Sequence, residues 1–542
     1  MDEYKNTRFT VVLPVIISLS VITGIIIAEV FNKSNTNHSI LISSKKDKLN
    51  MVIDYVENEY VDEVTREQLA EIAIPKFLES LDPHTVYFTA EEAKGMEEEL
   101  EGNFEGIGIQ FNIYKDTVLV VAVIEEGPSE KSGLKSGDRI VFVNDTLIAG
   151  VNIDNEKVMS MLKGEEGSLV ELKVFRRGFK NLLTIKIMRG QVPLKSVDAY
   201  YKITDNIGYI KITSFAKNTH TQFIDAIFTM KQTGMKTVIL DLRNNSGGYL
   251  NSATDIIDEF LENGKMIVYT QGRARGKKVI NATTKRSACV DIDIVVLIDE
   301  FSASASEIVA GSIQDNDRGF IVGRRSYGKG LVQESTVFDD GSIIRLTTAR
   351  YYTPSGRCIQ KSYENGQDEY NADIYNRYIR GEFVEKDSIV LNDSLIFYTS
   401  KGRPVYGGGG IMPDVFVPID TTGYSKLYSD ISMKSLDYLF SIEYVDKNRE
   451  LFKDITTTKD FVALLKNQNV MSEFWKYVMN SGVNVRQSDI GISGKFIENN
   501  VYAYIARQIL GDSSFYEITN TIDPVMDTVL NIIKSGRKLK TD

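Results

Sequence analysis

The 542-residue sequence is poor in the residues that most often bind metals or form cross-links. It has two cysteines, Cys289 and Cys358, and three histidines, His38, His84 and His220. Two cysteines are too few for a disulfide framework, and neither residue type recurs at the spacing of a zinc site. We therefore expect no metal and no cofactor. With so few histidines, any catalytic base need not be an imidazole.

The sequence also lacks an excess of positive charge. Its formal net charge is −11, with 63 Lys and Arg against 74 Asp and Glu. Nucleic-acid-binding domains usually carry a basic stripe that matches the phosphate backbone, so we expect no nucleic-acid partner. Hydrophobic residues make up 42% and charged residues 25% of the chain, which is typical of globular proteins with room for about three or four domains.

One uncharged, mostly apolar run stands near the start of the chain. Phe9 to Ala28 gives 20 such residues, about the length that a helix needs to cross ~30 Å of hydrocarbon. Ile25 to Val30 makes a poor signal-peptidase site, which favours a retained anchor over a cleaved leader. Basic residues lie on both sides of the run, so their distribution alone leaves the orientation open. Asn32 to Ser44 is typical of a short tether.

The remaining pattern predicts a multidomain α+β protein. Helical spacing of apolar residues indicates a small helical module, short alternating strands indicate a compact β-domain, and strands alternating with helices indicate an α/β core with β-α-β crossovers. Long amphipathic stretches then indicate a helical C-terminal domain. The expected boundaries are 1–31 for a stub and membrane anchor, 45–101 for the helical module, 103–188 for the β-domain, 190–420 for the core and 421–542 for the C-terminal domain.

Glycines precede the first predicted strand of the β-domain. In Gly106-Ile107-Gly108-Ile109, outward-facing backbone N–H groups can receive a carboxylate without obstruction by a side chain. Downstream, Gly127 to Asp138 and Val143-Asn144 resemble the corresponding stretch of PDZ domains. The resemblance implies that an extended C-terminal peptide binds beside Gly106 to Phe111 by strand addition. An ordinary glycine-rich hairpin is the alternative.

A strand, a tight turn and a helix follow one another near residue 300. The apolar strand Ile292 to Ile298 leads through a Ser- and Ala-rich turn to a helix that begins near Ser304. A serine there is exposed at a helix N-terminus, where free N–H groups and the dipole can stabilise an oxyanion. Ser304-x-x-Glu307 is also an ordinary capping box, so the motif alone favours a structural role.

The second chemical motif is a lysine between two glycines. Gly323 to Lys329 matches the pattern G-x-x-x-x-G-K of phosphate-binding loops, but Gly330 replaces the Ser or Thr that would hold magnesium. A strand-like segment, Leu331 to Phe338, also stands where that loop requires a helix. A nucleotide site is therefore disfavoured.

Together these motifs resemble the C-terminal processing peptidases, the tail-specific protease family, over most of residues 46–420. The motifs that carry the resemblance occur in the family's order: Leu81-Asp82-Pro83-His84, the PDZ-like segment, Asp241 to Gly248, Ser302 to Glu307, Gly328 to Gln333, Tyr351 to Arg357, and Gly409 to Asp414. The resemblance implies an α/β core like that of the ClpP and crotonase folds. It also implies that the catalytic domain lies on the periplasmic or extracytoplasmic side of a bacterial inner membrane.

The resemblance further implies roles for individual residues. Ser304 is the expected nucleophile, Lys329 its base and Gln333 an assisting residue, and their spacing of 25 and four positions separates Ser304 from its neighbouring serines. The expected oxyanion donors are the N–H groups of Gly247 and Ala305. An arginine that links the PDZ domain to the active site in relatives is matched by Arg176, although a solvated strand end is an equal alternative.

The implied chemistry is consistent with the residue types. A free lysine has a pKa of ~10.4, so burial must lower the pKa of Lys329 before its amine can take the proton of a serine hydroxyl. A neutral amide such as Gln333 can orient the amine without the negative charge that would raise its pKa.

The sequence therefore predicts a membrane-anchored serine endopeptidase that takes the C-terminal tails of proteins or peptides. Two other classes stay open: a catalytically inactive PDZ scaffold at the membrane and a crotonase-like acyl-transfer enzyme. The natural substrate, the formation of a homo-oligomer and the role of residues 421–542 are not determined by the sequence.

Overall fold

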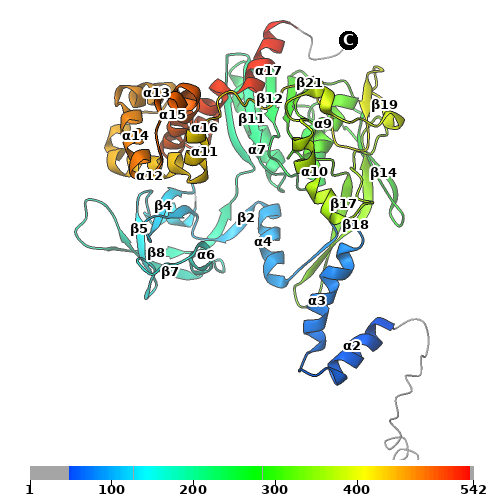
Figure 1. The fold of residues 1–542 in the computed structure, drawn as a ribbon, viewed down its shortest axis with the longest axis horizontal. Helices are drawn as coiled ribbons and strands as arrows, with labels where there is room; N and C mark the ends of the chain where they lie inside the picture. The colour runs from blue at the N-terminus through cyan, green and yellow to red at the C-terminus, as the bar shows by residue number, and fades with distance from the viewer. Residues whose placement is uncertain (1–47, 126, 284, 537–542) are drawn as a thin grey trace, which may run out of the picture. The chain divides into compact units, whose positions relative to one another are not determined.

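The computed structural model describes residues 48–125, 127–283 and 285–536. The predicted anchor lies outside these residues. Within them, no helix combines the length and apolar character that a membrane crossing requires. The chain divides between Lys76 and Phe77 into two units. Figure 1 shows the order of the described elements along the chain. In the first unit, α2 (Lys48–Glu59) has no buried residue, and it is followed by α3 (Arg66–Glu79), which continues into the second unit.

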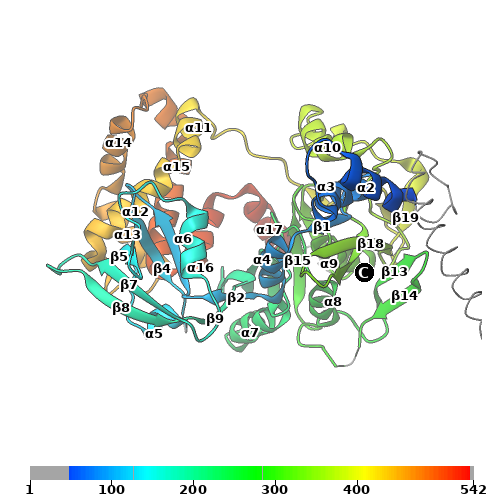
Figure 2. The same cartoon turned by 90° about the horizontal axis from the view of Figure 1, so that it is seen from below.

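The segment predicted as a helical module also contains a strand. After α3, β1 (Val86–Phe88) pairs antiparallel with β18 (Ile343–Tyr352), a strand more than 250 residues away in the sequence. The helix α4 (Ala90–Glu101) follows, capped by Thr89 and Glu92 in a reciprocal capping box. It leads directly into β2 (Asn103–Gly106), which pairs with β9 (Gly190–Pro193) at the far end of the β-domain (Figure 2).

The β-domain is a six-stranded antiparallel sheet with two helices. Alternating apolar residues such as Val170, Leu172 and Val174 point to one face, where they pack with Ile140 and Val158 in one core. Its elements are β3 (Ile109–Ile113), β4 (Val118–Val123), α5 (Pro128–Lys131), β5 (Arg139–Val143), β6 (Thr146–Leu147), α6 (Asn155–Leu162), β7 (Leu169–Phe175) and β8 (Leu183–Met188).

The α/β core is built on a second six-stranded sheet, in the order β10-β11-β12-β15-β16-β21. Only β10 runs antiparallel to its neighbour, which confirms the predicted crossovers. The elements are β10 (Val197–Lys202), β11 (Ile207–Ile212), α7 (Thr219–Gln232), β12 (Thr237–Asp241), α8 (Leu250–Asp258), β15 (Asp293–Ile298), α9 (Ala305–Asp315), β16 (Phe320–Gly323) and β21 (Val415–Phe416).

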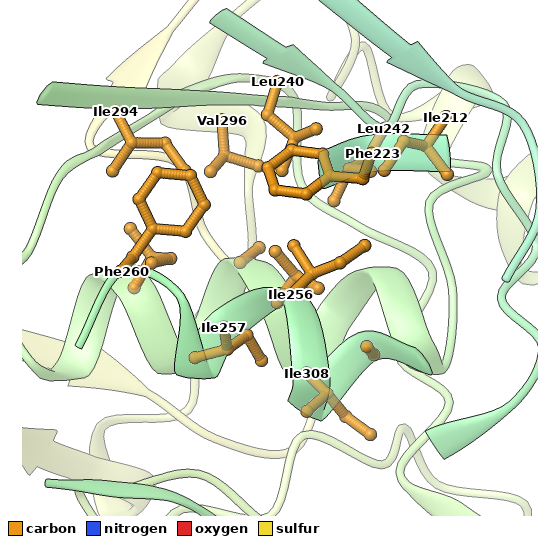
Figure 3. Packing of buried hydrophobic residues seen from close by; sticks show 14 of the residues in the cluster. Ile212, Phe223, Leu240, Leu242, Ile256, Ile257, Phe260, Ile294, Val296 and Ile308 are labelled. Atoms are coloured by element: carbon orange, nitrogen blue, oxygen red, sulfur yellow. The ribbon is translucent and has the colours of Figure 1, made fainter. Parts of the chain in front are cut away.

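The two faces of this sheet are buried against different helices. Leu240 and Val296 point toward α8, where they pack over Ile256 and Ile257 (Figure 3). The alternate positions, such as Ile239, Val295 and Leu297, face the other side and pack with Val525 and Val529 of α17 (Pro524–Lys534). Helix α17, the last helix among the described residues, thus packs on the protease core, although its residues lie within the predicted C-terminal domain.

In addition to these two six-stranded sheets, the structure contains a five-stranded antiparallel sheet that the sequence pattern did not predict. It joins β13 (Met266–Gly272), β14 (Gly276–Asn281), β17 (Leu331–Val337) and β18 to β1. Further along the chain lie α10 (Gln367–Ile379), two 3-10 turns at Lys386–Ser388 and Asp393–Leu395, and the small pair β19 (Ile396–Tyr398) and β20 (Pro404–Tyr406).

The predicted C-terminal helices are present and share one core. Leu427, Phe440, Phe461, Phe474 and Val501 are buried together. The elements are α11 (Lys426–Met433), α12 (Leu436–Asn448), a 3-10 turn at Arg449–Phe452, α13 (Thr458–Asn467), α14 (Val470–Asn480), α15 (Gln487–Leu510), α16 (Asp512–Thr519) and a 3-10 turn at Asn520–Ile522. Helix α12 also contacts the β-domain, where Tyr114 donates to Glu443 at 2.6 Å and Arg139 pairs with Asp446 at 2.9 Å.

Candidate functional site

The candidate catalytic residues follow the carboxyl ends of neighbouring parallel strands. Asn244 to Gly248 follow β12, Ser304 follows β15, and Lys329 follows β16. Because β12, β15 and β16 are adjacent and parallel, these ends lie at one edge of the sheet, the usual position of a site in an open α/β sheet.

Ser304 has an unusual backbone conformation. Its φ of 53° and ψ of −113° lie in a region that side-chain-bearing residues rarely occupy, at a cost of about 1–3 kcal/mol. It is the N-cap of α9, so the N–H of Ala305 at the first helical position has no intrahelical acceptor. Among the three serines of the motif, Ser304 alone is half-exposed. Ser302 and Ser306 are buried and donate to the carbonyl oxygens of Leu242 and Asn245, both at 2.9 Å.

The carboxylate of Glu307 holds the Ser304 turn and the Lys329 loop together. It accepts from the N–H groups of Ser304 (2.9 Å), Gly328 (2.7 Å) and Lys329 (2.8 Å), and from the Ser326 hydroxyl (2.6 Å). Burial raises the pKa of Glu307 to about 7, although these four hydrogen bonds favour the carboxylate. Glu307 of the capping box therefore not only caps the N-terminus of α9 but also holds the Lys329 loop.

Tyr351 of β18 is a second tie between the two segments. Its buried hydroxyl lies 3.1 Å from the carbonyl oxygen of Ser304 and also within hydrogen-bonding distance of the carbonyl oxygen of Lys329. The backbone at both candidate catalytic residues is thus fixed from two directions.

The surroundings of Lys329 favour its neutral form. Burial is the largest effect and, with the positive charge of Arg345, lowers the pKa of the Lys329 amine to about 8. Glu307 and Asp82 act in the opposite direction. Burial and the Lys329 charge lower the pKa of nearby His84 to about 4, so its imidazole is neutral near pH 7.

Ser304, Lys329 and Gln333 line one cavity of about 640 Å³. Its wall also includes Gly247 and Ala305, so the five residues predicted as catalytic or as oxyanion donors share one space. Other contributors come from α4, α8 and β18, among them Met96, Glu99, Leu250, Arg345 and Tyr351.

Gly247 has no room for a side chain. A Cβ there would lie 2.7 Å from the Ser304 Cβ and 3.0 Å from the Ala305 nitrogen, and its φ of 108° is one that glycine adopts without strain. The backbone of Gly247 therefore lies directly against the Ser304 turn. Its N–H donates to Asn245 Oδ1 at 2.8 Å in this structure, so this predicted donor is already engaged.

A second, smaller cavity lies in the β-domain. It measures about 280 Å³ and is lined by three of the four residues predicted to receive a peptide, Ile107, Gly108 and Ile109. The fourth, Gly106, is buried at the end of β2 and pairs with Gly190. The cavity is also lined by Lys163, whose ammonium pairs with Glu98 of α4 at 2.5 Å.

Arg176 lies within the β-domain. Its guanidinium donates to both carboxylate oxygens of Asp138 at 2.6 Å and to the Gly133 carbonyl at 2.9 Å. These contacts hold the turn after α5 to the end of β7. They do not reach the Ser304 cavity, and a regulatory role for Arg176 stays a prediction.

Comparison with known proteins places this arrangement in a family. Residues 206–367 match the Peptidase family S41, 106–187 match the PDZ domain, and 427–511 match a family of unknown function (DUF8443). The carboxy-terminal processing protease CtpA of Bacillus subtilis (strain 168) is 35% identical over 59% of this chain and 67% of that protein. A carboxy-terminal-processing protease of Bartonella bacilliformis is 38% identical over 57% and 71%, respectively. The chain belongs to peptidase family S41.

One solved structure is similar to part of this S41 peptidase. The photosystem II D1 C-terminal processing protease is 25% identical, covers 68% of this chain and 86% of its own, and has a TM-score of 0.36. The predicted family and the PDZ domain are therefore confirmed by the sequence matches. The matches to the two carboxy-terminal processing proteases also disfavour a catalytically inactive scaffold.

Sequence reasoning missed part of the site of this S41 peptidase. Glu307 was recognised only as a capping residue, and the roles of Tyr351 and Asn245 were not assigned. The motif patterns contain all three, but only the fold shows which groups they contact. Within residues 48–125, 127–283 and 285–536, no cluster of three or more potential metal ligands was found.

Proposed function

We propose that this S41 peptidase is a serine endopeptidase that uses a Ser304/Lys329 dyad assisted by Gln333 to cut extended or C-terminal regions of proteins. The observation that carries the proposal is that Lys329, half-buried and with its pKa lowered to about 8, lines the same cavity as Ser304. A lysine with a lowered pKa that shares a cavity with a serine has the property that a general base needs.

The reaction follows from these groups. The neutral Lys329 amine takes the Ser304 hydroxyl proton while the serine oxygen attacks the scissile carbonyl carbon and forms a tetrahedral oxyanion. The ammonium then protonates the leaving amine, the peptide C–N bond breaks, and an acyl-enzyme remains. Water, deprotonated by the same amine, attacks the ester, and Ser304 recovers its proton as the carboxylic product leaves.

The oxyanion would be stabilised by backbone N–H groups. Ala305 supplies one, from the first position of α9, where the helix dipole also favours negative charge. Gly247 would supply the second once its N–H leaves Asn245 Oδ1, so binding of substrate would exchange one acceptor for another. Each such donor contributes typically ~3 kcal/mol to the transition state.

The PDZ domain would present the substrate. A free C-terminus added as a strand beside Ile107 to Ile109 would place its carboxylate among outward-facing N–H groups. Helix α4 lines both the PDZ cavity and the catalytic cavity, with Glu99 in the wall of each. A tail bound in the first cavity would thus lie beside the helix that borders the second. We further propose that residues 9–28 anchor the chain in the membrane, with the peptidase on the extracytoplasmic side.

The test is cleavage of a denatured protein by the purified full-length chain, with substrates that end in a free carboxylate or in a carboxamide. Ser304→Ala and Lys329→Ala should abolish cleavage, whereas Ser335→Ala, which alters an exposed serine of the same cavity wall, should not. The carboxamide should be cut more slowly. Wild-type cleavage rates in either dyad variant would refute the assignment, and binding of tails without any cleavage would favour the scaffold.

A further inference from the structure

A hydrogen-bonded chain connects Gln333 to a carboxylate outside the catalytic motifs. Gln333 of β17 and Thr347 of β18 are cross-strand partners beside a register shift, and Gln333 Nε2 donates to Thr347 Oγ1 at 3.4 Å. Thr347 Oγ1 in turn donates to Asp82 Oδ1 at 3.1 Å. Asp82 belongs to the Leu81-Asp82-Pro83-His84 motif, for which the proposed mechanism has no use.

The direction of this chain is fixed by the chemistry of its ends. A carboxylate can only accept, so the single hydroxyl proton of Thr347 must go to Asp82. The Thr347 oxygen is then left to accept, and Gln333 must turn its NH₂ group toward it. The Gln333 oxygen is the end of the amide that remains for the cavity that Lys329 also lines.

This orientation matters for a lysine base. A neutral amine has two N–H donors and one lone pair, and the lone pair must face the Ser304 hydroxyl. An amide oxygen beside the amine accepts one N–H and leaves the lone pair free. An amide NH₂ in the same place would instead compete with Ser304 for that lone pair.

Asp82 itself is held rigidly. Its Oδ1 also accepts from the N–H groups of His84 and Thr85, both at 2.9 Å, and its Oδ2 accepts from the Thr85 hydroxyl at 2.6 Å. The Thr85 oxygen accepts in turn from the Thr347 N–H at 3.1 Å, and Thr85 is buried. The Asp82 carboxylate is therefore held by hydrogen bonds to His84 and Thr85, which precede β1, and to Thr347 of β18.

We propose that Asp82 and Thr347 are positioning residues of the dyad, which turn the Gln333 amide so that its oxygen accepts from the Lys329 amine. The inference rests on the proposed Ser304/Lys329 mechanism. Asp82 also acts on Lys329 through its charge, together with Glu307 on α9 and Arg345 on β18, whereas the neighbouring His84 imidazole is neutral near pH 7. Asp82 and Glu307 raise the pKa of Lys329, and Arg345 lowers it.

The first experiment separates the effect of the Thr347 hydroxyl from the effect of the side chain's branched shape. Thr347→Val keeps the β-branched side chain but removes the proton donor, whereas Thr347→Ser keeps the hydroxyl. We expect Thr347→Val to lower kcat by about 10–100-fold with little change in KM, since a misplaced catalytic group has effects of this size. Thr347→Ser should retain most of the wild-type rate. Thr336→Val, at an exposed position of β17, is the matched control.

The second experiment separates orientation from charge. Asp82→Asn keeps an acceptor oxygen for Thr347 but removes the negative charge, so the acidic limb of the kcat/KM profile should move to lower pH. Thr347→Val should leave that limb in place, because the Asp82 charge remains. Asp339→Asn, which removes an exposed carboxylate two residues after β17, should change neither kcat nor the position of the acidic limb.

Three results would overturn the inference, and the first two are full kcat in Thr347→Val and an unshifted acidic limb in a folded and active Asp82→Asn protein. Equal loss of activity in Thr347→Ser and Thr347→Val would do so as well, since only a structural role predicts it. Failure of the dyad itself would look different, because Ser304→Ala would then retain wild-type cleavage and the Asp82 and Thr347 variants would not matter.

Discussion

Ser304 and Lys329 donate their backbone N–H groups to the same oxygen, Glu307 Oε2, at 2.9 and 2.8 Å. The proposed nucleophile and base lie on separate loops after β15 and β16, so one buried atom, together with the Tyr351 hydroxyl, holds the two loops at a fixed relative position. The other oxygen of Glu307 accepts from Gly328 and Ser326 and fixes the start of the Lys329 loop. Positioning here depends on a carboxylate that does not itself react.

Replacement of Glu307 by Gln should therefore disable the enzyme. An amide keeps the size of the side chain but turns NH₂ toward backbone N–H donors, which leaves buried donors unpaired at a cost of about 1–3 kcal/mol each. We expect kcat to fall about 100-fold or more and the free energy of unfolding to fall. Steady-state kinetics and denaturant unfolding measure both values. Glu364→Gln, a change on the surface, should leave kcat and stability at the wild-type values. A fully active Glu307→Gln enzyme would show that the Glu307 hydrogen bonds do not position the two loops.

The pH dependence of cleavage should report Lys329. The base works only when neutral, and its pKa is about 8, so kcat/KM should rise with pH through an apparent pKa near that value. Initial rates with a peptide substrate between pH 6 and 10 provide the profile. A rate that is already maximal and flat below about pH 7 would show that a different group is the base.

The pH dependence of the protein's thermal stability should also reveal the lowered pKa of Lys329. The folded-state pKa of Lys329 is lowered from 10.5 to about 8, so the charged form is penalised on folding. The penalty is complete below about pH 8 and disappears as the pH approaches 10.5. We expect Lys329→Met to unfold at a higher temperature than wild type at pH 7, with a gap that narrows toward pH 10. Thermal melts at a series of pH values test this, and a constant gap would argue against a perturbed lysine.

Much of this fold can be predicted from sequence, for identifiable reasons. The strands Arg139–Val143, Leu169–Phe175 and Ile207–Ile212 are short runs of β-forming residues flanked by turn residues, the pattern from which the sequence predicts strands. The pairing of β1 with β18 was not predictable, since it joins segments more than 250 residues apart. Helix α17 is amphipathic, but its sequence pattern does not tell which surface its apolar face covers, and it covers the protease sheet.

The site divides in the same way. Ser304, Lys329 and Gln333 could be named from motif spacing, and the structure places all three at one cavity. Their supports could not be named, because Glu307, Thr347 and Asp82 act through contacts that only the assembled fold creates. The hydrogen bond from the Gly247 N–H to Asn245 Oδ1 could not be predicted either, since a motif specifies a glycine but not its hydrogen-bond partner.

A final prediction concerns the ion pair between Glu98 and Lys163 at the PDZ cavity. Lys163 lines the cavity where a tail's carboxylate would bind, and Glu98 of α4 already occupies its ammonium at 2.5 Å. The pair is partly exposed, so its own contribution to stability is about 0–1 kcal/mol. Glu98→Gln removes the competing charge, and we expect a C-terminal peptide to bind up to about fivefold more tightly, in keeping with that small energy.

Binding is best measured by fluorescence polarisation on the Ser304→Ala background, so that the peptide is not cut. Lys163→Met should weaken binding of the same peptide, and a peptide amide should bind weakly to every variant because it lacks the charge at issue. Glu97→Gln on the same helix serves as the matched control, since Glu97 does not line the cavity. Unchanged affinity in both Glu98→Gln and Lys163→Met would mean that the peptide's C-terminus binds away from Lys163. Peptide binding would then not disturb the ion pair between Lys163 and Glu98 of α4.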